Sequence, residues 1–385
     1  MTPHSTVVLV AHAVHDHGGM ERAFAELVRR ASPRWRFVVV ATELADDLVP
    51  LVEWQRVRVP RRPFPIRFVA FFGLAGLRVR SLRRRDAVIV HALGAIIPNR
   101  VDVATVPYCH AGARVAGVGR DEGELPWIRR ANNALTRVLG RAAERFCFRP
   151  GRVGVLGAVS DGLVDEVAHH YPAVARTMTP NGVDVDHFHP DPAARARLRA
   201  AEGVGDDEVV VLFVGGQWAR KGLPIVLDAV AALDGRLRVW VVGHGDERWL
   251  ARRAESLRLT GRVRSFGPQP DTAPFDAAAD CFVLPSRYET FSLVAFEAAA
   301  AGLPLVVAPV HGARELVEDG RAGRLVARHP AAVAGALREL AEDPELRRRL
   351  GTEARERASA WTWARSVAAV EAAYRGVAGG ERHLG

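Results

Sequence analysis

The stretch VVVLFVGGQWARKG, residues 209–222, decides the fold class of this chain. Its apolar half predicts a buried strand, Gly215-Gly216 predicts a tight loop, and a helical pattern begins at Leu223. Such a strand–loop–helix unit suits a phosphate group, because glycines permit close backbone approach and a helix N-terminus offers unpaired N–H groups. Arg220-Lys221 would supply positive charge beside it.

Lys221 is the single lysine among 53 basic residues, so arginine fills every other basic position. A compact ammonium can serve where the broad guanidinium fork does not fit, which makes Lys221 a candidate ligand for phosphate. The alternative is a surface lysine near a turn.

Short apolar runs alternate with helical patterns along the whole chain, which predicts an α/β fold with parallel sheets. Strands are expected near 7–12, 35–41, 56–59, 87–91, 102–108, 153–159, 209–214, 237–242, 263–266, 281–284, 304–308 and 324–326. Helices are expected near 20–31, 64–84, 124–148, 161–169, 222–233, 247–258, 291–301 and 331–341, with arginine-rich helical turns after Pro344. These series predict two doubly wound units, 1–183 and 184–360, followed by a last helix over 361–376. We expect this helix to pack back on the first unit.

The composition, with 49% hydrophobic and 25% charged residues, is that of an ordinary globular protein. Cys109, Cys147 and Cys281 are far apart and form no ligand-like spacing, so we expect neither a disulfide framework nor a zinc site. The N-terminal residues have no basic region before the first apolar run, and no apolar stretch is long enough to span a membrane. We therefore expect a cytoplasmic protein.

The net charge of +9 comes from the first half, where residues 1–184 hold 26 arginines against 17 acidic residues. Many of these arginines surround the apolar, aromatic segment 64–77. That pattern is typical of an interfacial helix on an anionic membrane and equally of a core helix with a solvated basic end. Nucleic acid is not expected, because no recognition motif accompanies the charge.

Two carboxylates eight positions apart, Glu289 and Glu297, follow the predicted strand 281–284. With a helix starting at Phe291, Glu297 would lie roughly 9 Å along its axis. Carboxylates suit vicinal hydroxyl groups, and the helix N-terminus between them suits a diphosphate. The alternative is that Glu297 is a solvated helix residue and Glu289 interacts only with the helix dipole.

In their order and spacing these motifs resemble the retaining, nucleotide-sugar-dependent glycosyltransferases of the GT-B fold, in the family-four group (glycosyl transferases group 1). The resemblance extends over nearly the whole chain and rests on segments 18–22, 86–91, 181–184, 215–222, 242–245 and 285–297, with Phe188, Gly312, Glu315, Gly320 and Gly323. It implies two Rossmann-like domains facing across a cleft, an acceptor-binding domain over 1–183 and a nucleotide-sugar-binding domain over 184–360.

The resemblance also implies a role for each candidate residue. Arg220 and Lys221 would neutralise the diphosphate leaving group, Glu289 would hold the transferred sugar, and His110 would face it near the reacting carbon. The donor-binding residues implied are Gly18, Gly19, Gly215, Gly216, Gly243, Phe291, Ser292, Leu293 and Glu297. His110 has a structural alternative, because a lone histidine after a strand is more often structural. The histidines at 12, 15 and 17 are weaker candidates for acceptor contact.

One position departs from the family pattern, which often has arginine where this chain has Gly216. Arg220 is expected to supply the missing cation. No metal or other cofactor is expected, since Arg220, Lys221 and a helix dipole would replace a cation; Asp184-Val185-Asp186 has a metal-like spacing but lies in the segment between the domains.

We therefore predict transfer of a sugar from a nucleoside diphosphate to a glycan or lipid-linked acceptor, with retention at the anomeric carbon, by a protein peripheral on the inner face of the plasma membrane. A noncatalytic nucleotide-sugar-binding protein is the main alternative. A glycoside hydrolase using Glu289 and Glu297 leaves the loop at Lys221 unexplained. An NAD-dependent oxidoreductase is weaker still, since no full GxGxxG opens the first helix.

Overall fold

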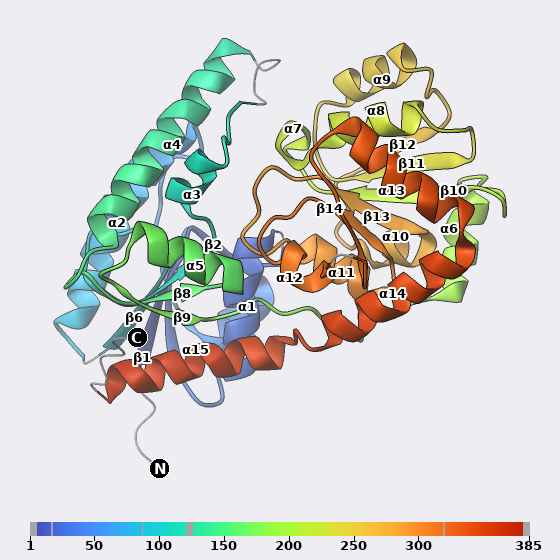
Figure 1. Ribbon diagram of the computed structural model, residues 1–385. Helices are drawn as coiled ribbons and strands as arrows, with labels where there is room; N and C mark the ends of the chain where they lie inside the picture. Colours follow the sequence, from blue (N-terminus) through green and yellow to red (C-terminus); the bar gives the residue numbers. More distant parts are fainter. Residues whose placement is uncertain (1–5, 17, 87, 121–125, 319, 380–385) are drawn as a thin grey trace. The chain divides into compact units, whose positions relative to one another are not determined.

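The computed structural model describes residues 6–16, 18–86, 88–120, 126–318 and 320–379 (Figure 1). The chain forms two compact units. The N-terminal unit comprises Met1–Gly182 and Trp363–Gly385, and the C-terminal unit comprises Val183–Thr362. No helix in the described ranges is long and apolar enough to cross a membrane.

The N-terminal unit is built on a seven-stranded sheet in the order β5-β3-β1-β6-β7-β8-β9, with every neighbouring pair parallel. Its strands are β1 (Thr6–Val10), β3 (Arg36–Ala41), β5 (Glu53–Arg56), β6 (Val88–Leu93), β7 (Val101–Val106), β8 (Val153–Ala158) and β9 (Ala175–Met178), and β2 (Ala13–Val14) pairs with β4 (Glu43–Leu44). Its helices are α1 (Gly19–Ala31), η1 (Asp46–Leu51), α2 (Phe64–Arg83), α3 (His110–Val115), α4 (Trp127–Cys147), α5 (Asp161–His170) and α15 (Trp363–Ala378).

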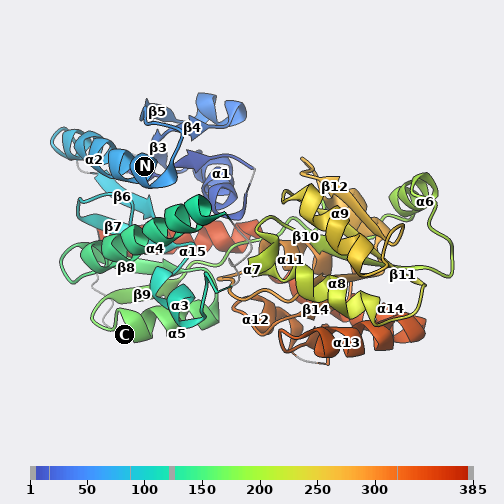
Figure 2. The same cartoon turned by 90° about the horizontal axis from the view of Figure 1, so that it is seen from above.

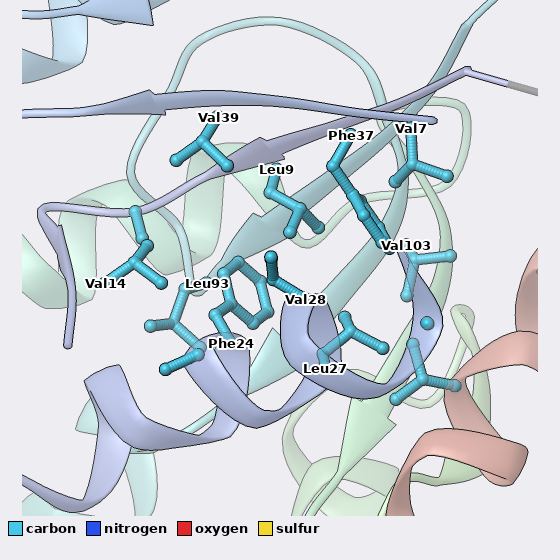
Figure 3. Packing of buried hydrophobic residues seen from close by; sticks show 14 of the residues in the cluster. Val7, Leu9, Val14, Phe24, Leu27, Val28, Phe37, Val39, Leu93 and Val103 are labelled. Atoms are coloured by element: carbon cyan, nitrogen blue, oxygen red, sulfur yellow. The ribbon is translucent and has the colours of Figure 1, made fainter. Parts of the chain in front are cut away.

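One face of this sheet packs against α1 and α15. Alternate strand residues such as Leu9 and Val39 point to the same side, where Phe24 and Val28 of α1 meet them (Figure 3). Tyr374 of α15 completes this core and hydrogen-bonds through its hydroxyl to His91 Nδ1 at 2.7 Å. The last helix therefore belongs to the core of the N-terminal unit.

The C-terminal unit has a six-stranded parallel sheet in the order β12-β11-β10-β13-β14-β15. Its strands are β10 (Val209–Val214), β11 (Leu237–Val242), β12 (Val263–Gly267), β13 (Cys281–Leu284), β14 (Leu305–Val307) and β15 (Gly323–Leu325). Its helices are α6 (Pro192–Ala201), α7 (Trp218–Lys221), α8 (Leu223–Ala231), α9 (Glu247–Ser256), α10 (Ala273–Ala278), α11 (Leu293–Ala300), α12 (Ala313–Val317), α13 (Pro330–Glu342) and α14 (Pro344–Ser359).

Helices cover both faces of the C-terminal sheet (Figure 2), which explains why all six residues of β10 are apolar and buried. The strand predicted over 56–59 lies earlier in the chain, because β5 spans Glu53–Arg56. The predicted elements did not include β2, β4, β9, η1, α3, α6, α7, α10 and α12. All of these except α6 have six residues or fewer, too few for the hydrophobic period to give a clear signal. Helix α6 has ten residues but only one large apolar residue, Leu198.

Candidate functional site

Two glycines bring the carboxyl ends of β10 and β11 together. Gly215 and Gly243 both have positive φ, 139° and 124°. A Cβ atom added to Gly243 would lie 2.6 Å from the carbonyl oxygen of Gly215, closer than real contacts permit. Glycine is therefore needed at 243, and the two loops meet backbone to backbone.

The Lys221 side chain lies over Gly215. A Cβ atom on Gly215 would be 2.6 Å from Lys221 Cδ and 2.7 Å from Nζ. Gly216 has more room, since its added Cβ would meet only His244, at 3.3 Å. Lys221 is the last residue of the short helix α7, and Gly222 after it has φ 89°, which lets α8 begin in a new direction.

Glu289 is the carboxylate that these cations surround. Its Oε1 lies 3.2 Å from Arg220 Nη1 and 3.8 Å from Lys221 Nζ, and the Ser286 hydroxyl donates to it at 2.8 Å. Burial alone would raise the pKa of Glu289, but Lys221, Arg220 and the Ser286 hydrogen bond hold that pKa below its usual range. Glu289 is therefore ionised, and the site has two cations around one carboxylate.

The ammonium of Lys221 is in the opposite situation. Burial lowers its pKa, and the nearby Glu289 and Glu297 carboxylates offset part of that effect. The Lys221 side chain is 14% exposed and that of Glu289 is 13% exposed, so water screens their attraction only weakly. An anionic ligand bound here in addition to the Glu289 carboxylate would be attracted by a positive charge that water screens only weakly.

Arg328 holds the two loops of the site in place. Its Nη2 donates to the carbonyl of Ala219 at 2.6 Å, and its Nε donates to the carbonyl of Pro285 at 3.1 Å. The Arg287 N–H donates to the Arg220 carbonyl at 2.9 Å, which adds a direct link between the loops. Arg328 was not predicted as a site residue, because nothing in its local sequence distinguishes it from the other arginines.

Helix α11 begins later than predicted. It starts at Leu293, with Ser292 before it in the left-handed region at φ 69°, so Glu297 lies about 6 Å along the axis instead of roughly 9 Å. The Phe291 ring stacks on Phe296 in the core, with ring centroids 4.1 Å apart, which leaves its backbone as the group available to a ligand. Within the described residues the buried Ser292 hydroxyl has no hydrogen-bond partner.

Glu297 is buried beside a second acid that the sequence analysis missed. Glu297 is 7% exposed, so it is not a solvated helix residue, and Asp276 of α10 is 1% exposed. Burial raises the pKa of Asp276 well above its usual value, and the neighbouring Glu297 carboxylate raises it further. Burial and the neighbouring carboxylate therefore favour the protonated form of Asp276 over the charged one.

The N-terminal unit contains the remaining candidates. Gly18, with φ 107°, directly precedes α1, which begins at Gly19. His110 begins α3, and its imidazole packs so closely on α4 that a Cβ atom at Gly140 would lie 2.4 Å from Nε2. Burial, and then the charge of Arg141, lower the pKa of His110 to about 4, so the ring is neutral at pH 7.

A buried carboxylate fixes the start of α3. Glu144 of α4 accepts the backbone N–H of His110 at 2.7 Å and the hydroxyl hydrogen of Tyr171 at 2.8 Å. Burial raises the pKa of Glu144 to about 7 despite these hydrogen bonds. No sequence motif indicated Glu144, which orients His110 through the backbone.

The weaker histidine candidates have different surroundings. The His12 ring lies among aromatic rings of α2, with its centroid 4.3 Å from that of Phe71, and burial lowers its pKa to about 4. Position 17 lies outside the described residues. Asp184 accepts the N–H groups of Asp186 and His187, both at 3.1 Å, so the Asp-Val-Asp segment forms a local turn.

The structure therefore groups the predicted residues into two sets. Gly215, Gly216, Arg220, Lys221, Gly243, Glu289, Phe291, Ser292, Leu293 and Glu297 belong to the C-terminal unit, and Gly18, Gly19 and His110 belong to the N-terminal unit. In the first set, measured contacts join Gly215, Gly243, Arg220, Lys221 and Glu289.

The chain is similar to known proteins in sequence and in fold. Residues 208–343 match the family described as glycosyl transferases group 1. The D-inositol 3-phosphate glycosyltransferase of Geodermatophilus obscurus is 33% identical over 398 residues, which cover 94% of this chain and 86% of that protein. The protein of the same name from Thermobispora bispora is 30% identical, covering 93% and 90% of the two chains.

Two solved structures share the fold. WaaG, a glycosyltransferase involved in lipopolysaccharide biosynthesis, superposes with a TM-score of 0.79 at 22% identity, covering 98% of this chain and all of that one. Anabaena Alr3699/HepE in complex with UDP-glucose gives 0.74 at 18% identity, again over 98% and 100%. The chain therefore belongs to the group 1 family of glycosyltransferases, has the GT-B fold, and is an enzyme that uses a nucleotide-sugar donor.

Proposed function

We propose that this enzyme transfers a sugar with retention at the anomeric carbon, with its donor's diphosphate bound beside Lys221 and Arg220. The observation that carries the proposal is the convergence of both cations on Glu289, at 3.8 and 3.2 Å, next to a loop that tolerates only glycine at 215. As the bond from sugar to phosphate breaks, negative charge grows on the diphosphate. Fixed cations at that point stabilise the transition state more than the ground state.

The remaining donor contacts follow from the start of α11. Its first N–H groups, at Leu293 and Val294, have no partner within the helix and face an anion favourably. The buried Ser292 hydroxyl adds a polar group, and Glu297 lies about one turn further along. We assign the phosphates to the helix start, the ribose hydroxyls to Glu297 and the hydroxyls of the transferred sugar to Glu289.

The acceptor is assigned to the N-terminal unit, where Gly18 and Gly19 would let the loop before α1 approach the acceptor and the donor's phosphates, and the neutral His110 imidazole would face the sugar. In the mechanism we propose, the departing phosphate accepts the proton of the acceptor hydroxyl, so neither glutamate acts as a nucleophile. The cations and the α11 N-terminus supply the positive charge this scheme needs, without a metal ion.

The relatives suggest which substrates to test first. HepE was solved with UDP-glucose, and the similar sequences are D-inositol 3-phosphate glycosyltransferases. We therefore propose a UDP-sugar donor as the first candidate. For the acceptor we propose a lipid-linked or cell-envelope glycan at the cytoplasmic face of the membrane, because the N-terminal unit carries the excess of positive charge.

A donor screen tests the proposal directly. Ligands that bind only the folded chain raise its melting temperature, so UDP, GDP, ADP and their sugars should separate by the shift each produces. The preferred nucleotide should stabilise the wild type and not Lys221→Ala. Failure of every nucleoside diphosphate to bind would reject the donor site.

A second assay separates enzyme from sensor. Slow hydrolysis of the preferred nucleotide sugar, or transfer to a glycan, is expected of the enzyme, whereas a noncatalytic binding protein would bind the donor and leave it intact. Retention is checked by determining the anomeric configuration of the product; inversion would overturn the proposed mechanism.

A further inference from the structure

Large apolar side chains are exposed mainly on two helices of the N-terminal unit. Of the thirteen large exposed hydrophobic residues in the described ranges, nine lie on α2 or α4. These nine are Phe64, Ile66, Val69, Leu74, Leu77, Trp127, Ile128, Leu135 and Val138. Phe64 differs from the others because its ring centroid lies 5.9 Å from that of His12; we call the other eight the α2–α4 face. The two helices pack on each other, with the ring centroids of Phe72 and Phe146 6.4 Å apart (Figures 1 and 2).

The exposed residues form stripes at helical spacing. On α4, Ile128, Leu135 and Val138 are separated by seven and three positions. On α2, Ile66, Val69 and Leu77 lie on one side of the helix, with Gly73 between Val69 and Leu77. The opposite side of α2 already supplies core residues such as Phe71, which is fully buried. Folding of this unit therefore does not use the exposed stripes, which need another explanation.

The exposed charge on the same two helices has one sign. Together α2 and α4 contain nine arginines, and their single acidic residue, Glu144, is 2% exposed and hydrogen-bonded to α3. Two of the arginines, Arg67 and Arg83, pair with acids of neighbouring strands. By contrast α14, on the C-terminal unit, carries Glu345, Glu353 and Glu356 among its arginines, and such a mixture of charges is common on water-facing helices.

We infer that the α2–α4 face docks on the surface of an anionic lipid bilayer. Apolar side chains would enter the headgroup region while the arginines meet lipid phosphates, and this needs both features that the face combines. A second copy of the chain fits poorly, because two such faces would oppose like charges. Nucleic acid would pair with the arginines and leave the apolar stripes exposed to water.

This inference rests on the proposed function for its purpose, since docking would bring the acceptor-binding unit to a lipid-linked acceptor. Docking and donor chemistry can fail separately. Donor hydrolysis without vesicles depends on residues outside the α2–α4 face, so variants of this face should retain it.

Vesicle flotation tests the inference. The full chain should float with vesicles of phosphatidylglycerol and phosphatidylcholine at low salt, float much less at 0.5 M salt, and stay at the bottom with phosphatidylcholine alone. The double variant Ile66→Ser/Leu77→Ser should lose at least tenfold in apparent affinity. Its matched control is Val49→Ser/Leu51→Ser, which changes two exposed apolar residues of η1 in the same unit and should bind like the wild type.

Charge is tested in the same assay. Arg80→Glu/Arg84→Glu, at the end of α2, should weaken binding at least tenfold, whereas Arg248→Glu/Arg252→Glu, on exposed positions of α9, should change it little. Equal losses for both pairs would show that binding follows net charge alone and would overturn the face as the docking site.

Trp127 provides a direct reporter, because it is 75% exposed at the start of α4. Brominated lipid should quench the fluorescence of the wild type more than that of Trp127→Phe. Three results would overturn the inference: no flotation with anionic vesicles, unchanged binding by Ile66→Ser/Leu77→Ser, or concentration-dependent self-association that this variant abolishes, which would identify a second copy as the occupant.

Discussion

Lys221 Nζ lies 3.8 Å from Glu289 Oε1, and both side chains are largely buried. The lysine also lies across Gly215, where any side chain would collide with it. An ion pair so poorly solvated stabilises the fold little, because desolvation offsets the attraction between the charges. It does hold an ammonium at a fixed point beside Glu289, four residues before α11 begins.

Replacing the lysine tests that role. Lys221→Ala should lower kcat for transfer about 10²- to 10³-fold, the usual loss when one fixed group that stabilises transition-state charge is removed. Arg220 and Ser286 still hold Glu289, so circular dichroism should show an intact fold. Lys221→Arg should not restore activity, because a broad planar guanidinium places its donors differently from a compact ammonium. Arg236→Ala, an exposed cation of the same unit, is the control; near-normal turnover by Lys221→Ala would refute the assignment.

Gly243 should tolerate no side chain. Gly243→Ala forces Cβ to 2.6 Å from the Gly215 carbonyl, so the two loops must separate and nucleoside diphosphate binding should weaken at least tenfold. Gly261→Ala is the matched control, since Gly261 also has positive φ, 83°, but nothing lies within 4 Å of its added Cβ. Isothermal titration with the preferred nucleotide compares them. Equal affinities would mean that backbone contact between the loops does not shape the donor site.

Asp276 should make stability depend on pH. The pKa of Asp276 is higher in the folded protein than in the unfolded chain, so this residue favours folding most at a pH below its unfolded pKa of about 4. That contribution to the free energy of unfolding is lost as the pH rises. Asp276→Asn keeps the shape of the side chain but cannot ionise. The melting temperature of this variant should therefore rise relative to that of the wild type between pH 4.5 and pH 8. Asp206→Asn, at an exposed position, should show no such trend. A difference independent of pH would contradict protonation of Asp276.

His110 should affect transfer but not nucleotide affinity. The cations around Glu289 belong to the other unit, so His110→Asn should bind nucleoside diphosphate normally and transfer sugar at least tenfold more slowly. His169→Asn, an exposed histidine of the same unit, is the control. Because its pKa is lowered to about 4, His110 should introduce no step in the rate between pH 6 and pH 8. Full activity of the variant would leave His110 with a structural role only.

The sequence by itself determined the architecture and the chemical types at the site. Buried apolar runs such as 209–214 demand a sheet covered on both faces, and Gly215 and Lys221 stand out locally in composition and spacing. Those signals depend only on residues that are neighbours in the sequence, so they can be recognised without the tertiary structure.

Tertiary structure alone decided which distant residues support that site. Arg328 reaches the carbonyl of Ala219 across 109 positions, and Asp276 is buried beside Glu297 although an isolated aspartate predicts a surface position. Likewise the apolar segment 64–77 had two interpretations, and only packing shows that Phe71 enters the core while Leu77 is 64% exposed. Local pattern sets which residues share a helix face, but contacts between elements decide which face is covered.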